Sequence, residues 1–281
     1  MREAGWSGRG LRSLQIPWLG LLLVGLLCAA ALVRPLRPVL LTLLIAAYGL
    51  GRWRHLDTRP IAATLPVAAI LAWGALPQPA AAADAAQCAD LLAPPAVWRL
   101  IEAAVGLLAV GLLVVDRRAS LAELGLRAGS RRNVLLSVVA VIVVTPVALL
   151  AGGLLGTTAL GGSFFGTYRL DLSQPAALLP AAVFAVSNSV AEELAYRGAM
   201  RVWLGPSLGV LGANLAQAVV FGVAHSGPDF VGPVAPTAAA MLAAGFMAGV
   251  IARRSTSLLF VIAAHAAFDV PLFFYWACRV G

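Results

Sequence analysis

The sequence predicts an all-α protein, a polytopic bundle of about eight or nine transmembrane helices with its N-terminus in the cytoplasm. Of the 281 residues, 61% are hydrophobic and only 11% are charged, and the mean hydropathy is +0.91. These values lie far from the composition of a soluble globular domain. The apolar residues fall in runs close to the roughly 20 residues that cross a bilayer, which indicates helices packed within a membrane.

Nine apolar segments are the candidate spans. The second is the weakest, because Arg37 and Arg52 bracket only 14 residues. As a span it would depend on its neighbours or on a locally thinner bilayer. The nine segments cover about residues 14–33, 38–51, 60–76, 96–115, 134–155, 176–204, 207–225, 233–252 and 257–277.

The basic residues predict the orientation of these spans. All 20 of them are arginines, and a cytoplasmic N-terminus places most of them in cytoplasmic connections. This agrees with the positive-inside rule, so the net charge of +8 is assigned to topology and no nucleic-acid partner is expected. The apolar N-terminal stretch is interpreted as an uncleaved first helix of a bacterial cytoplasmic (inner) membrane protein.

The predicted spans divide the chain into two regions. Residues 1–133 hold N-terminal transmembrane helices and an amphipathic cytoplasmic segment at 116–133, and residues 134–281 form a membrane core whose polar motifs lie within 176–277. The Ala- and Pro-rich connection 77–95 has no basic residue and is expected on the outer side. Cys28, Cys88 and Cys278 give neither a disulfide framework nor a zinc spacing, although they allow a bridge between Cys88 and Cys278.

Charged residues at membrane depth gather in the last four spans. Such charges are costly, so they usually pair with one another or mark function. The first five spans supply little beyond Arg99 and Glu102. The charged and imidazole residues of the last four spans are Glu192, Glu193, Arg197, His225, His265 and Asp269, with Asn188, Asn214 and Gln217 nearby.

Helical spacing separates the two adjacent glutamates. Glu193 and Arg197 are four residues apart, so they share a helix face and can neutralise each other. Glu192 points about 100° away and is free to face the bundle interior. The alternative is one buried ion cluster that contains both glutamates and Arg197.

The two intramembrane histidines follow the same spacing rule. His225 comes four residues after Phe221, and Asp269 comes four residues after His265. Neighbouring spans run antiparallel and are joined by predicted turns at Gly205-Pro206 and at Arg253-Arg254. Measured from these turns, the depths of Glu192, His225 and His265 agree to within about two helical turns. The positions are therefore compatible with one buried site.

These residue types suit hydrolysis inside the membrane. Hydrolysis needs a base that activates water and donors for the oxyanion. Glu192 with His225 can hold and deprotonate a water, while His265 and Asp269 can donate to the developing charge. The alternative is a divalent metal such as zinc, held by Glu192, His225 and His265, although the H-E-x-x-H motif is absent from the sequence.

The C-terminal part of the sequence contains three motifs: E-E-x-x-x-R at 192–197, F-x-x-x-H at 221–225 and H-x-x-x-D at 265–269. Over residues 176–277 they resemble the CPBP family of intramembrane proteases, which includes type II CAAX prenyl endopeptidases and bacteriocin-processing or immunity proteins. The resemblance implies a glutamate-dependent endopeptidase that needs no cofactor. It assigns Glu192 as general base, His225 as its helper in activating water, and His265 with Asp269 as the oxyanion-stabilising pair. Supporting roles go to Glu193, Arg197 and Phe221.

One position departs from the family pattern, in which the third motif often ends in Asn. An ionised Asp269 cannot donate a hydrogen bond. Either Asp269 is protonated, or it orients His265, or His265 and another donor hold the oxyanion.

Other functional classes also fit parts of the sequence. A non-catalytic scaffold or immunity-type member would share the fold, and a proton-coupled transporter would also use Glu, His and Asp in its spans. A transporter predicts polar residues through both halves of the bundle, whereas they are found in the last four spans. The expected partners are the lipid bilayer and a membrane-anchored protein or peptide substrate.

Overall fold

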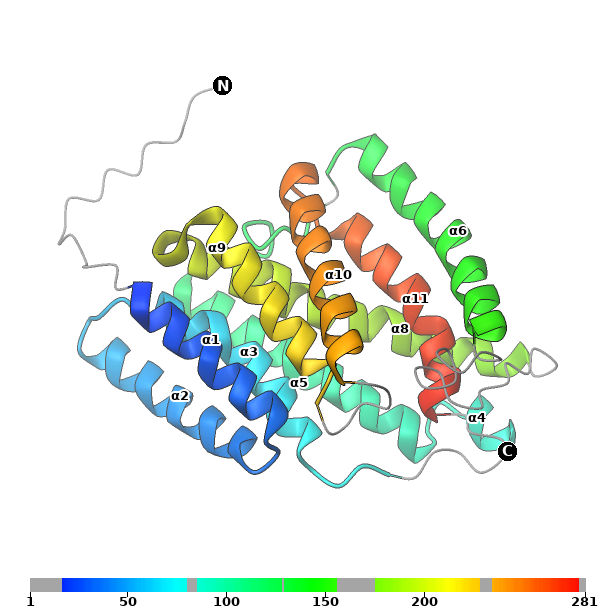
Figure 1. The fold of residues 1–281 in the computed structure, drawn as a ribbon, viewed down its shortest axis with the longest axis horizontal. Helices are drawn as coiled ribbons and strands as arrows, with labels where there is room; N and C mark the ends of the chain where they lie inside the picture. Colours follow the sequence, from blue (N-terminus) through cyan, green and yellow to red (C-terminus); the bar gives the residue numbers. More distant parts are fainter. Residues whose placement is uncertain (1–16, 80–84, 128, 156–174, 228–233, 278–281) are drawn as a thin grey trace.

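A computed structural model describes residues 17–79, 85–127, 129–155, 175–227 and 234–277 (Figure 1). Every regular element in these residues is a helix and none is a strand, so the predicted all-α class is confirmed. The elements are α1 (Pro17–Leu32), α2 (Leu36–Trp53), α3 (Arg59–Gly74), α4 (Ala85–Ala89), α5 (Pro94–Arg117), α6 (Arg131–Leu155), η1 (Pro175–Ala177), α8 (Leu178–Glu193), η2 (Leu194–Met200), α9 (Arg201–Ala224), α10 (Val234–Ser255) and α11 (Leu259–Ala277).

Three helical stretches among the described residues are long and apolar enough to cross a membrane: Ala86–Arg117, Pro175–Ala224 and Val234–Ser255. Shorter apolar helices occupy Pro17–Leu32, Arg59–Gly74 and Leu259–Phe273. These helices coincide with segments that the sequence predicts. The helix α2, which corresponds to the weakest predicted span, is in neither group, and the count of eight or nine spans and the cytoplasmic N-terminus stay predictions.

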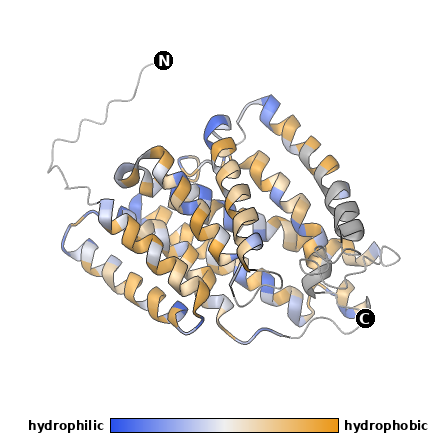
Figure 2. Cartoon of the chain, viewed as in Figure 1, coloured by the Kyte–Doolittle hydropathy of each residue, from blue (hydrophilic) through white to orange (hydrophobic). Residues whose placement is uncertain are grey.

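Many large apolar side chains of the described residues are exposed, and hydrophobic residues predominate along the helices (Figure 2). On α5, Leu108, Leu112 and Val115 are 62%, 62% and 78% exposed. Their spacing of three to four residues places them along one helix face. An apolar face of this kind is suited to contact with lipid rather than water.

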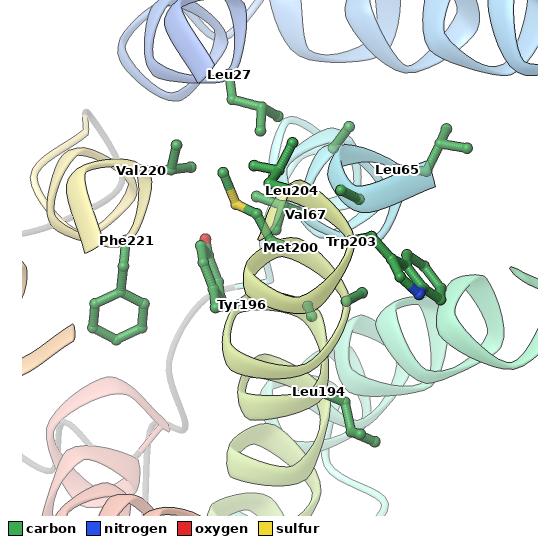
Figure 3. Close-up of a cluster of buried hydrophobic side chains, with 14 of the residues drawn as sticks. Leu27, Leu65, Val67, Leu194, Tyr196, Met200, Trp203, Leu204, Val220 and Phe221 are labelled. Atoms are coloured by element: carbon green, nitrogen blue, oxygen red, sulfur yellow. The ribbon is translucent and has the colours of Figure 1, made fainter. Parts of the chain in front are cut away.

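The main core lies where η2 and α9 pack against α1 and α3 (Figure 3). Met200 and Leu204 are fully buried there, together with Leu27 of α1 and Val67 of α3. Val220, from the later part of α9, closes the same cluster. This packing fixes the helical stretch that follows the two glutamates.

The chain changes from α-helical to π-helical geometry directly after Glu193. The π-helix η2 runs from Leu194 to Met200, and all of its residues are buried. π-helical turns are rare and are frequently found at functional sites. The predicted continuous helix over 176–204 is therefore interrupted by a wider turn that contains Arg197.

The chain reverses direction within α9. The sequence predicts the turn at Gly205 and Pro206, whereas the non-helical residue is Gly209, with φ 71° and ψ 169°. Glycine adopts a positive φ without the steric cost of a Cβ atom. The later part of α9 then packs against η2 and carries His225 back to within 3.7 Å of Glu192.

Polar side chains and small residues join α9 to α10. Asn214 donates a hydrogen bond from Nδ2 to the carbonyl oxygen of Phe246 at 3.1 Å, and Gln217 donates from Nε2 to that of Gly245 at 2.9 Å. A Cβ atom at Gly249 would lie only 1.7 Å from Oδ1 of Asn214. Small residues at such crossings let helix backbones approach closely in a membrane. Asn214 and Gln217 thus hold two helices together.

The described residues between α5 and α6 form turns that pack on the core. Leu124 is fully buried, and its carbonyl oxygen lies 3.2 Å from the position of a Cβ atom at Gly198 in η2. The carbonyl oxygen of Gly125 accepts a hydrogen bond from the backbone N–H of Leu258 at 2.8 Å. The connection therefore contacts both η2 and the start of α11. Its predicted position against the lipid headgroups stays a prediction.

The cysteines differ in state. Cys88 in α4 is disulfide-bonded, whereas Cys28 in α1 is free. Cys278, which the sequence offers as a partner for Cys88, lies outside the described residues. Disulfides are typical of compartments outside the cytoplasm, which supports the predicted outer position of the 77–95 connection.

Candidate active site

Four side chains from three parts of the bundle lie close together. Oε2 of Glu192, in α8, lies 3.7 Å from Nε2 of His225 and 3.8 Å from Nε2 of His265. His225 directly follows α9, and His265 lies in α11. Nε2 of His265 also lies 3.6 Å from Oδ1 of Asp269. The fold thus brings together the four residues that the sequence singles out, while their chemical roles stay predictions.

The contacts of Glu192 are longer than direct hydrogen bonds. Its Oε2 atom is buried and has no hydrogen-bond partner among the described residues. Polar contacts of this length leave room for a water molecule that bridges the groups. Glu192 is therefore placed to bind a water molecule that both imidazoles also contact.

Glu193 has a different environment from its neighbour. It is 1% exposed, and its Oε1 atom lies 3.0 Å from Nη1 of Arg197. This is the predicted ion pair, although Nη1 lacks the alignment of a hydrogen bond. The same Oε1 atom accepts a hydrogen bond from Nδ1 of His265 at 2.9 Å. Within the described residues Arg197 forms its ion pair with Glu193, while Oε2 of Glu192 lies near the two imidazoles.

Both imidazoles are held by their Nδ1 atoms. Nδ1 of His225 lies 2.8 Å from the carbonyl oxygen of Phe221. Because a carbonyl oxygen only accepts, Nδ1 carries the hydrogen of this bond. Nδ1 of His265 likewise donates to the carboxylate of Glu193. Each ring therefore presents Nε2 to Glu192, and a neutral His225 offers a lone pair at that atom.

The ring of Phe221 supports this arrangement. The guanidinium carbon of Arg197 lies 4.1 Å from the centre of the ring, and the imidazole of His225 lies at a centroid distance of 4.1 Å. Tyr196 meets the ring edge-on at 5.1 Å. Residues four apart on a helix share a face, so the F-x-x-x-H spacing places Phe221 directly beside His225.

Asp269 acts as a hydrogen-bond acceptor in this structure. It is 2% exposed, and its Oδ2 atom accepts bonds from Nδ2 of Asn188 at 2.9 Å and from Oγ of Ser189 at 3.2 Å. The sequence gives no role to these two donors in α8. The available signal is position, because Asn188 precedes Glu192 by four residues and therefore shares its helix face.

A cavity of about 540 Å³ adjoins these groups. Asn188 and the four candidate catalytic residues border it, together with apolar side chains of α10 and α11. The apolar wall includes Met241, Met247, Phe260, Phe268 and Leu272.

The N-terminal helices also contribute charge to the cavity, through the two charged residues that the sequence names in these spans and through Arg37. Arg99 and Glu102 of α5 border it and form an ion pair, with Nη1 and Oε2 2.6 Å apart. Arg37 of α2, treated in the sequence as the edge of a weak span, is 2% exposed and borders it as well. Its guanidinium donates to the carbonyl oxygens of Ala30 at 3.1 Å and Ala31 at 2.8 Å near the end of α1.

The candidate metal ligands were Glu192, His225 and His265. Among the described residues, no group of three or more His, Cys, Asp or Glu side chains is arranged to hold a metal ion. That the protein needs no cofactor remains a prediction.

Comparison with known proteins supports the resemblance. Residues 174–271 match the family model described as type II CAAX prenyl endopeptidase Rce1-like. No curated protein and no solved structure matches the chain. The matched segment contains all three motifs, and this similarity together with the long apolar helices indicates an integral membrane protein. Over the segment that carries the candidate active site, the chain is thus similar to the Rce1-like type II CAAX prenyl endopeptidases.

Proposed function

We propose that this protein is an intramembrane endopeptidase that hydrolyses a peptide bond of a membrane-anchored or lipid-modified protein or peptide. The observation that carries the proposal is the approach of two imidazole Nε2 atoms, at 3.7 and 3.8 Å, to one buried carboxylate oxygen of Glu192 beside a cavity. The matched family supports a protease of the CAAX type.

In the proposed reaction Glu192 is the general base. It takes a proton from a bound water, whose oxygen forms the new bond to the peptide carbonyl carbon. His225, with its hydrogen on Nδ1, accepts a hydrogen bond from the same water at Nε2. The C–N bond then breaks, and the leaving amine takes the proton from Glu192, so that atoms and charges balance.

His265 and Asp269 stabilise the oxyanion that forms on the reacting carbonyl. With Nδ1 bonded to Glu193, a proton on Nε2 of His265 can be donated to the oxyanion. Asp269, 3.6 Å from Nε2, orients the ring and balances its charge in the transition state. This role accommodates an ionised Asp at a position where the family often has Asn.

The cavity wall supports a substrate that is held in the membrane. Methionine and phenylalanine side chains of α10 and α11 border the cavity, and Met247 and Phe268 are 55% and 36% exposed. Met side chains adapt to irregular apolar ligands. A lipid group or an apolar peptide segment would pack on this wall while the peptide bond reaches Glu192.

The test uses purified protein in liposomes and a quenched-fluorescence peptide that ends in a prenylated C-a-a-X sequence. Glu192→Gln keeps the side-chain shape but removes the base, so we expect kcat to fall by roughly 10²- to 10⁴-fold. The matched control is Glu123→Gln, at an exposed turn position, with unchanged kcat. Equal cleavage by wild type and Glu192→Gln would refute the mechanism.

The same assay distinguishes the proposed mechanism from two alternatives, a metal-dependent protease and a non-catalytic scaffold. With the metal-free mechanism, a chelator leaves the wild-type rate unchanged. Loss of cleavage with chelator, restored by zinc, would assign the reaction to a metal instead. A wild-type protein that leaves the peptide intact and binds it with the affinity of Glu192→Gln would favour a scaffold.

A further inference from the structure

Resting on the proposed peptidase function, we infer that Asn188 is a further catalytic residue, which donates a hydrogen bond from its side-chain amide to the oxyanion. Asn188 borders the cavity and lies one helical turn before Glu192 on the same face of α8. Its amide supplies the donor that Asp269 cannot supply when ionised.

The orientation of this amide follows from its partner. An ionised carboxylate only accepts hydrogen bonds, so Asn188 must turn its NH₂ group, and not its carbonyl oxygen, towards Asp269. The observed contact is of this kind, with Nδ2 of Asn188 2.9 Å from Oδ2 of Asp269. Asp269 thus fixes which end of the amide faces the site.

The amide keeps a second N–H after this bond. Each Asn side chain has two N–H donors on one nitrogen, and within the described residues one of them is used, on Asp269. Asn188 and His265 both border the cavity. Two donors from α8 and α11 then face the reacting carbonyl, which is the usual composition of an oxyanion hole.

Ser189 provides a matched comparison for this assignment. Its Oγ atom also donates to Oδ2 of Asp269, at 3.2 Å, but Ser189 is fully buried and does not border the cavity. Removal of either side chain deprives Asp269 of one hydrogen bond. Only removal of Asn188 would also deprive the oxyanion of a donor.

The test compares Asn188→Ala with Ser189→Ala on the prenylated peptide in liposomes. We expect Asn188→Ala to lower kcat by about 10²- to 10³-fold with little change in KM, as for loss of one oxyanion donor. Ser189→Ala should change kcat by only a few fold. Equal losses of kcat in the two variants would overturn the assignment and leave Asn188 as a support for Asp269.

A binding measurement separates this inference from the proposed function. The probe is a phosphinate peptide of the same sequence, whose negative oxygen stands where the oxyanion forms. Its Kd should rise by about 10- to 100-fold in Asn188→Ala, the value of one hydrogen bond to a charged group, and stay near wild type in Ser189→Ala. An unchanged Kd in Asn188→Ala would contradict the inference. By contrast, full cleavage by Glu192→Gln would refute the peptidase mechanism itself.

Exchange of the two side chains gives an independent readout. Asn188→Asp alone places two carboxylates side by side and should abolish cleavage. The double variant Asn188→Asp with Asp269→Asn returns one amide and one carboxylate to the pair, so part of the lost kcat should return. A double variant no more active than Asn188→Asp would count against donation by the amide.

Discussion

Nδ1 of His265 donates a hydrogen bond to Oε1 of Glu193, while Nε2 of the same ring faces Oε2 of Glu192. Two consecutive glutamates therefore contact opposite sides of one imidazole. Such an arrangement requires that α11 crosses the end of α8 where the helix geometry changes. It gives Glu193 a structural contact to Arg197 and leaves Glu192 towards the cavity.

The two glutamates should differ in their effect on stability. Glu193→Gln leaves the buried Arg197 without a counter-charge, which typically costs about 3–5 kcal/mol of unfolding free energy. Glu192→Gln removes no ion pair with an arginine and should unfold near the wild-type temperature. Thermal unfolding of both variants in the same detergent measures the difference. Equal unfolding temperatures of the two variants would show that the ion pair of Glu193 does not stabilise the fold.

The guanidinium of Arg197 is expected to matter for its shape as well as its charge. It lies over the ring of Phe221 at 4.1 Å, a contact that a planar cation makes better than an ammonium. Arg197→Lys should therefore lose about 1–2 kcal/mol of stability, while Arg197→Ala should lose more. Denaturation of the two variants side by side provides the measurement. If Lys restores wild-type stability, the stacking on Phe221 contributes nothing.

Gly249 should not tolerate a side chain. A methyl group there would overlap Oδ1 of Asn214 at 1.7 Å, so Gly249→Ala should cost about 1–3 kcal/mol by overpacking α9 against α10. The matched control is Gly49→Ala in α2, where a Cβ atom meets nothing within 4 Å. That variant should be neutral or slightly more stable, because alanine favours helix over glycine. A neutral Gly249→Ala would contradict the close packing of these helices.

The orientation of the bundle can be tested with reporters at residues 85 and 125. Position 85 starts α4, beside the disulfide-bonded Cys88, and position 125 lies in the connection before α6. We expect a reporter at 85 to be active outside the cytoplasm and one at 125 to be active inside it. Both reporters on one side would rule out the predicted alternation of spans.

The sequence was sufficient to predict the class of fold and the members of the cluster. Long apolar runs leave few alternatives to helices, because backbone groups in lipid must be satisfied within the segment. Spacing of four residues also predicted the pairing of Glu193 with Arg197, because that relation is local to one helix.

Contacts between helices were harder to predict. Spacing gives the face on which a side chain lies but not the helix that covers it, so the bonds from Asn188 and Ser189 to Asp269 were missed. The guanidinium of Arg37 reaches carbonyl oxygens near the end of α1, a position that hydropathy assigns to the edge of a span. The reversal at Gly209 lies beyond the predicted Gly-Pro turn, because several glycines in this stretch permit it.

The π-helical segment η2 constrains the length of the chain. A π-helix bonds five residues apart instead of four, so it holds one more residue in its turn than an α-helix would. If the same residues formed a regular α-helix instead, all that follows would be rotated by about 100° about the helix axis. Met200 and Leu204 would then leave the core, and the return of α9 to Glu192 would be lost. The number of residues between Glu193 and Arg201 is therefore matched to the π-helical geometry of this segment.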